Sequence, residues 1–163
     1  GEAELAGQVA ERLDTLAAQN ENSLPLKVSH MEVAAMSMLV NSHEMTGATA
    51  TNQHQQAIAM LQKAVELTNQ GRLPNGAANP LKPVHELTGE VLLHAGRSTE
   101  AAALFEESLL RMPNRPLSLA GAARTYKKAG DAVRAAEKYE ALLAIWSDDS
   151  NPAVQEAKDY LGF

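Results

Sequence analysis

Apolar residues recur along this chain at helical spacing, and no long segment alternates apolar with polar residues as a half-buried strand would. In the first segment, Leu5, Val9, Leu13 and Leu16 follow one another at intervals of four, four and three residues, which places them on one helix face. Clusters of glycine, proline and asparagine divide the chain into about eight such pieces. The pattern therefore predicts an all-α protein.

The N-terminal half is predicted to contain three helices. The first covers 3–19, the second covers 25–45, and the third is centred on 57–67. The second is apolar on nearly all sides, so we expect it to lie between neighbouring helices. The small polar segment 46–52 is predicted as a loop, and 71–79, which contains proline, asparagine and glycine, as a linker.

Beyond residue 80 the chain repeats itself with a period of 34 residues. The shift places large residues opposite large ones and small residues opposite small ones. The pairs are Gly89 with Ala123, Leu92 with Tyr126, Gly96 with Gly130, Ala101 with Ala135, and Phe105 with Tyr139. A fixed period of this length is typical of stacked helix-turn-helix units.

These residues make the segment from Gly89 to Pro113 resemble a tetratricopeptide repeat (TPR) of the bacterial type, and the segment from Ala123 to Leu142 resemble the next copy. The physical requirements agree with the resemblance, because small residues are needed where two helices approach closely and large ones fill the space between them. The resemblance implies an α-solenoid of helix-turn-helix repeats, with about eight helices in a right-handed superhelical array.

The resemblance is strong over about half of the chain, so the expected organisation differs along the sequence. We expect a single TPR-like domain over 1–163. Within it, 1–79 would form degenerate helical repeats, 80–149 two regular units, and 150–163 a C-terminal capping helix.

Composition and charge exclude several classes of function. The 163 residues are 45% hydrophobic with a formal charge of −6, which predicts a soluble globular domain and argues against nucleic acid or an anionic membrane as the main partner. The chain has no cysteine, which excludes disulfide frameworks, zinc fingers and thiol nucleophiles. No apolar run is long enough for membrane insertion. The chain begins with Gly1, which indicates a processed or excised piece, so the compartment stays open and a targeting signal would lie upstream.

Two candidate chemistries compete with a purely structural interpretation. The strings His43–Gly47 and His85–Gly89 begin like the helical zinc-protease motif, but glycine stands where the second histidine must be. Segment 30–60 holds five of the six methionines and three of the five histidines, donors that suit copper(I). A methionine-rich core or compliant surface explains the same pattern. We therefore predict no cofactor, no metal site and no catalytic residue.

The resemblance also implies where a partner would bind. TPR arrays usually hold an extended peptide or a helix of another protein in the concave groove formed by the first helix of each repeat. On this sequence the groove would be lined by Glu86, Glu90, Leu93 and His94 from one unit, by Ala120, Arg124, Lys127 and Lys128 from the next, and by Val154 and Lys158 from the cap. This lining is acidic at one end and basic at the other.

The predicted function is thus a non-enzymatic protein-interaction scaffold that binds a peptide or helix of a partner. The TPR clamp for terminal carboxylates needs lysine and asparagine where Glu86 and Glu90 stand, so recognition of chaperone tails is disfavoured. One alternative is self-association into a homo-oligomer, through the methionine-rich helices or the unfinished last repeat. A copper-handling or enzyme-accessory domain is another. A structural interpretation is that Glu90 and Arg124 pair across adjacent helices and only hold the stack.

Overall fold

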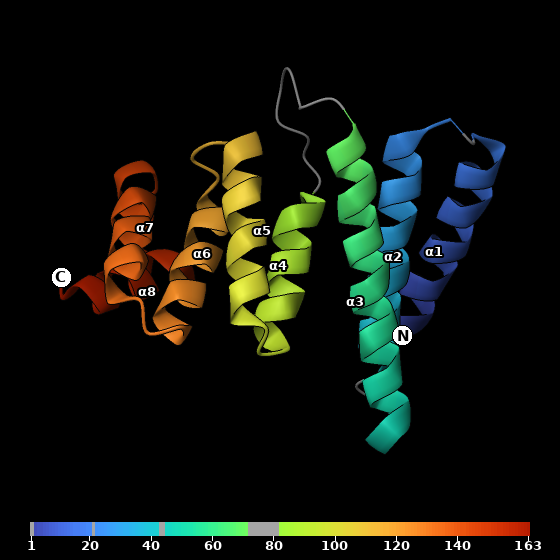
Figure 1. Ribbon diagram of the computed structural model, residues 1–163, viewed down its shortest axis with the longest axis horizontal. Helices are drawn as coiled ribbons and strands as arrows, with labels where there is room; N and C mark the ends of the chain where they lie inside the picture. Colours follow the sequence, from blue (N-terminus) through green and yellow to red (C-terminus); the bar gives the residue numbers. More distant parts are fainter. Residues whose placement is uncertain (1, 21, 43–44, 72–81) are drawn as a thin grey trace. The chain divides into compact units, whose positions relative to one another are not determined.

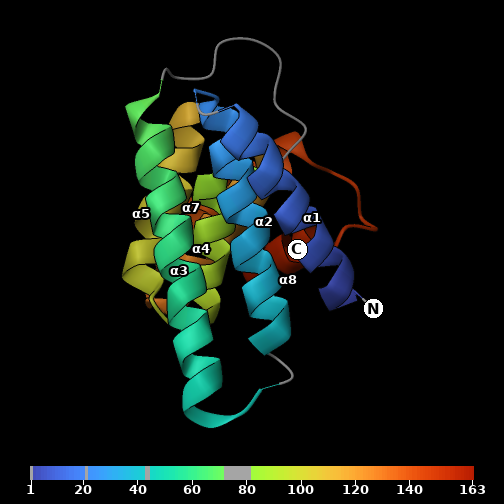
Figure 2. The ribbon, with the colours of Figure 1, turned by 90° about the vertical axis from the view of Figure 1, so that its right-hand side faces the viewer.

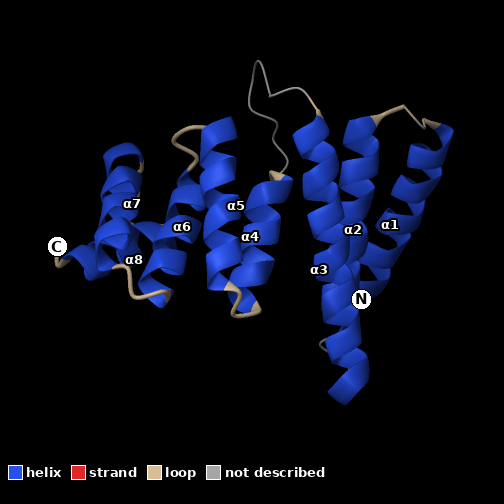
Figure 3. Cartoon of the chain, in the orientation of Figure 1, coloured by secondary structure: helices blue, strands red, loops and turns tan. Residues whose placement is uncertain are grey.

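The computed structural model describes residues 2–20, 22–42, 45–71 and 82–163, and over these residues it contains eight helices and no strand (Figure 3). The helices are α1 (Glu2–Gln19), α2 (Leu24–Ser42), α3 (Gly47–Gln70), α4 (Val84–His94), α5 (Ser98–Arg111), α6 (Pro116–Lys128), α7 (Ala132–Ile145) and α8 (Pro152–Leu161). The all-α prediction is confirmed.

The helices group into two compact units, unit 1 over Gly1–Arg72 and unit 2 over Leu73–Phe163 (Figure 1). The boundary between them falls inside the predicted linker 71–79, nearly all of which lies outside the described residues. The single-domain organisation stays a prediction.

In unit 1, α2 lies between α1 and α3 and contacts both of them, whereas no close approach between the backbones of α1 and α3 is found among the described residues (Figure 2). This is the position expected for a helix that is apolar on nearly all sides. Its Ala35 is fully buried, and so is Leu61 of α3. Two apolar side chains of α2 nevertheless reach solvent: Met36 is 38% exposed and Val40 is 36% exposed.

The predicted loop 46–52 is wrong, because α3 begins at Gly47. The small polar composition of this segment was the reason to expect a loop. However, no glycine or proline follows until Gly71, and alanine is the best helix former. The Thr51 hydroxyl also finds a partner inside the helix, because it donates to the carbonyl oxygen of Gly47 at 3.2 Å.

Unit 2 consists of two helix pairs, α4 with α5 and α6 with α7, followed by α8. Both pairs turn on a glycine with positive φ, Gly96 at 78° and Gly130 at 79°, a conformation that costs glycine little. The hydrogen bonds of the two turns also match. Arg97 N donates to Leu92 O at 2.9 Å, and 34 residues later the equivalent nitrogen and oxygen lie at the same distance. The repeat read from the sequence is therefore present in the backbone.

Phe105 of α5 is the central side chain of the first pair. It is fully buried, and a Cβ added at Gly89 of α4 would lie 3.1 Å from its ring. A Cβ added at Gly121 of α6 would come within 2.2 Å of the same ring. One phenyl ring thus fills the space that two helices leave by carrying glycine, one in its own repeat and one in the next.

The first helices of successive repeats lie closer together than the second helices do. The backbones of α4 and α6, and those of α6 and α8, approach each other closely. The backbones of α5 and α7, both fully described, lie farther apart and are joined by the ion pair of Glu106 with Lys138 at 2.8 Å. Within unit 2 the stack therefore curves with α4, α6 and α8 on its inner side. We call the solvent-facing side of these three helices the A-helix face.

Candidate partner-binding site

The structure places all seven predicted site residues on the three helices that form the A-helix face. Glu86, Glu90 and His94 lie on α4, Arg124, Lys127 and Lys128 on α6, and Lys158 on α8. They differ in what their charged groups contact, and this decides which of them a partner could reach.

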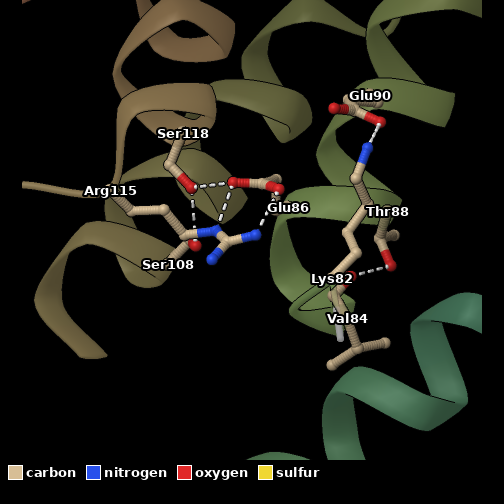
Figure 4. A network of polar contacts seen from close by, with 8 residues as sticks. All are labelled: Lys82, Val84, Glu86, Thr88, Glu90, Ser108, Arg115 and Ser118. Atoms are coloured by element: carbon tan, nitrogen blue, oxygen red, sulfur yellow. Dashed lines mark hydrogen bonds and ion pairs between the residues drawn. The ribbon is translucent and has the colours of Figure 1, made fainter. Parts of the chain in front are cut away.

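Glu86 does not line an accessible groove, and this part of the prediction is wrong. Its side chain is fully buried, and its carboxylate accepts hydrogen bonds from Arg115 Nε at 2.7 Å and from the Ser118 hydroxyl at 2.6 Å (Figure 4). Ser118 lies 2.9 Å from the hydroxyl of Ser108 on α5. Glu86 therefore joins α4 to the start of α6 inside the stack. Ala120 and Val154 of the predicted lining are fully buried too.

Glu90 and Arg124 do not pair with each other, contrary to the structural interpretation. The Glu90 carboxylate accepts from Lys82 Nζ at 2.5 Å (Figure 4). Arg124 donates from Nε and Nη2 to Glu156 of α8, at 2.7 and 2.6 Å. Each charge is thus already partnered within unit 2.

Glu156 connects α6, α7 and α8. Besides Arg124, it accepts a hydrogen bond from the Tyr139 hydroxyl at 2.7 Å. Burial alone would raise the pKa of Glu156, but the hydrogen bonds from Arg124 and Tyr139 outweigh it and hold that pKa below its usual value. Burial and the bond to Glu156 raise the pKa of Tyr139. The carboxylate therefore stays ionised and fixes α8 against the last complete repeat.

Three of the predicted residues, His94, Lys127 and Lys128, are exposed and form no ion pair with a described carboxylate. Lys128 Nζ donates only to the backbone oxygen of Leu93, at 3.2 Å, which brings it to the end of α4 beside His94. Lys127 Nζ lies 5.3 Å from the ring centroid of Tyr160. Lys158, by contrast, pairs with Asp149 at 2.5 Å. The reachable cations thus gather at the C-terminal ends of α4 and α6.

A hollow of about 570 Å³ opens beside Lys127. Its other walls come from α8, whose residues one turn apart face into it. They are Pro152, Gln155, Glu156, Asp159 and Tyr160. It combines an apolar wall, the ammonium of Lys127 and the carboxylates of Glu156 and Asp159, which suits contact with an extended chain of mixed polarity.

The alternative chemistries find little support in the described residues. No group of three histidine, aspartate or glutamate side chains that could hold a metal occurs in the part of the chain that the structure describes. His30 lies 3.7 Å from Asp14, and His54 Nδ1 lies 3.0 Å from the Ser42 hydroxyl. His43 lies outside the described residues.

His85, of the second protease-like string, is a core residue. Its side chain is 2% exposed, and Nε2 lies 3.4 Å from the Glu107 carboxylate. Burial lowers the pKa of His85, and the attraction of Glu107 does not reverse this shift. An imidazole held in this way lies under the second helix of its own repeat, away from solvent.

The residues that sequence reasoning missed act between repeats. Arg115 pairs with Glu86, 29 positions away, and Glu156 pairs with Arg124, 32 positions away. The 34-residue pattern does not reveal these pairs, because the residues at the equivalent positions of the other repeat do not carry the same charges. Gly121 offered a signal, since glycine inside a helix costs stability unless a neighbour needs the space. Tyr160 packs against the core cluster of α6, α7 and α8 and also forms a wall of the hollow.

These observations define a TPR-like helical-repeat fold. The crystal structure of TTC0263, a thermophilic TPR protein in Thermus thermophilus, is similar to this chain with a TM-score of 0.70. The alignment covers 99% of this chain and 76% of that one, at 17% sequence identity. The resemblance predicted from the 34-residue period is thus confirmed at the level of the fold.

No protein-family model matches the sequence, and the comparison with curated proteins found no match. None of the helices that the structure describes combines the length and the apolar character that crossing a bilayer requires.

Proposed function

We propose that the chain is a non-enzymatic scaffold that binds an extended peptide or a helix of another protein on the A-helix face of unit 2. The observation that carries the proposal is the inward curvature of the stack, which brings α4, α6 and α8 together and leaves a hollow between α6 and α8. Because rigid helices form this surface, binding a partner costs little free energy for ordering the site.

The side chains left available on this face support binding rather than catalysis. Leu93 is partly exposed at the end of α4, with Lys127 at its equivalent position one repeat later. Apolar and cationic groups placed side by side along a groove suit the alternating side chains of an extended peptide.

A pair of matched variants tests the proposal. Peptides that bind the protein are first selected from a random display library. Leu93→Gln on α4 is expected to lower the affinity for a selected peptide by about fivefold to tenfold, because about 1 kcal/mol of free energy from apolar burial is lost. Leu110→Gln makes the same chemical change on α5, where the side chain is 82% exposed, and should leave affinity unchanged. Equal effects of the two variants, with both proteins folded, contradict the proposal.

Self-association is a second candidate, and exposed apolar residues of unit 1 support it. On α1, Leu5 is 62% exposed and Val9 is 43% exposed, and they lie one turn apart. Sedimentation equilibrium over a range of concentrations tests this candidate. A mass that rises with concentration, and falls back after Leu5→Glu, supports it, and a constant mass of 17.4 kDa rejects it.

A further inference from the structure

Basic side chains in unit 2 are almost all neutralised within the unit. Residues 82–163, all of them described, contain ten lysine and arginine side chains, and eight of these lie within 4.0 Å of a carboxylate. The two exceptions are Lys127 and Lys128, which are consecutive at the end of α6. In a chain of net charge −6, two unneutralised cations on one edge form a distinct feature.

Both lysines are positioned by contacts that leave their charge available. The Lys128 ammonium donates to the carbonyl oxygen of Leu93, which fixes it at the C-terminal end of α4. The Lys127 ammonium lies over the ring of Tyr160, at the mouth of the hollow. A backbone carbonyl and an aromatic face orient an ammonium without cancelling its charge. The charge of Lys127 also helps to lower the pKa of Glu156, but neither lysine forms an ion pair within 4.0 Å among the described residues, so each can still pair with an anion.

We propose that Lys127 and Lys128 make the A-helix face a docking site for an acidic, extended segment of a partner protein. The inference rests on the proposed function and names its partner chemistry. The side chains of consecutive helical residues point about 100° apart, so the two ammonium groups can pair with different side chains along a bound peptide. A segment with at least two glutamate or aspartate side chains fits this arrangement, whereas one terminal carboxylate would satisfy one lysine only.

The hollow also contains groups that oppose an acidic ligand. Glu156 lies there, but Arg124 and the Tyr139 hydroxyl occupy its oxygens. Asp159 lines the same hollow, and no ion pair of its carboxylate is found among the described residues. Asp159 is therefore expected to weaken the site, which gives the test a variant that should improve binding.

The experiment uses three acetylated and amidated nine-residue peptides, in which serine alternates with glutamate, glutamine or lysine. Affinity is measured by titration of backbone amide shifts at low and moderate salt. The glutamate peptide should bind about fivefold or more tightly than the glutamine peptide at low salt, with a smaller difference at higher salt because surface ion pairs are screened. Lys127→Gln with Lys128→Gln should remove the difference. Asp159→Asn should strengthen binding of the glutamate peptide about twofold.

Lys63→Gln is the control for net charge. Lys63 is an exposed lysine of α3 that pairs with Glu66 at 2.9 Å, and its loss, like that of each mutated lysine, lowers the net charge by one. It should leave the preference for glutamate intact. Equal binding of the glutamate and glutamine peptides, tighter binding of the lysine peptide, or an equal loss in Lys63→Gln overturns the inference. Displacement of the glutamate peptide by a short oligothymidylate that binds the same two lysines more tightly also overturns it, in favour of nucleic acid.

The outcomes separate this inference from the proposed function. If library-selected peptides respond to Leu93→Gln but show no preference for acidic residues, only the partner chemistry is wrong. If no peptide perturbs α4, α6 or α8, both proposals fail.

Discussion

At the scale of single residues, Phe105 shows how one side chain restricts several others. Its ring occupies the space beside Gly89 and Gly121, so at these two positions glycine is required because a side chain would meet the ring. At the turns, glycine is favoured because φ is positive. At Gly89 an added Cβ would be tight, at 3.1 Å from the ring, whereas at Gly121 it would overlap the ring at 2.2 Å.

Gly121→Ala is therefore expected to destabilise the protein by about 2 kcal/mol or more, since overpacking forces a rigid ring to move. Gly89→Ala should cost less, because a shift of a few tenths of an ångström accommodates it. Chemical denaturation measures both. Combining Gly121→Ala with Phe105→Leu should recover part of the loss, and a double variant whose losses simply add would contradict this packing.

Glu32 of α2 gives a second prediction at this scale. Burial raises its pKa to about 7, and it forms no ion pair with any described residue. A carboxyl whose pKa is raised on folding contributes stability that is present below the unfolded value of 4.5 and is lost as the pH rises through about 7.

Glu32→Gln should therefore raise the melting temperature at pH 8 by roughly 2–4 °C, because each kcal/mol shifts the midpoint by about that much in a chain of this size. At pH 4 the wild-type carboxyl is protonated, so the variant should melt close to it. Thermal scans at the two pH values make the comparison, and a gain of the same size at both would show that the effect is not electrostatic.

At the scale of elements, the helices of unit 2 are joined by ion pairs that cross from one repeat to the next. Glu86 is the most buried of these, and it holds Arg115 and Ser118 at the start of α6. Removing one partner of a buried pair leaves the other desolvated and uncompensated.

Glu86→Ala is expected to destabilise the protein by about 3 kcal/mol or more on this basis. Glu100→Ala removes a carboxylate from an exposed pair with Arg97 and should change stability little. Urea denaturation of the two variants checks the contrast. Similar small losses in both would mean that the Glu86 network does not hold α4 to α6.

The sequence predicts most elements but not all of their ends. Helical spacing and a 34-residue period identified the helix pairs of unit 2 and the turns at Gly96 and Gly130, because these follow from local rules that repeat. The start of α3 was missed, since small residues such as those of 46–52 suit both a loop and a helix. Tertiary contacts decide between the two, and a sequence does not show them.

At the scale of the whole molecule, the fold was predictable and the site was predictable only in part. The period identified the helices that carry the A-helix face, and all seven predicted residues lie on them. Which of them remain available depends on pairs such as Arg124 with Glu156, and one chain gives no signal for these. The right-handed sense of the array stays a prediction.

We propose that unit 2 binds its partner on the inner side of the stack. The most direct measurement is a map of backbone amide shift changes when a library-selected peptide is added to the full chain. We expect shift changes on α4, α6 and α8, strongest near Lys127 and the hollow, with α5 and α7 little affected. Changes confined to α5 and α7, or to unit 1, would contradict it.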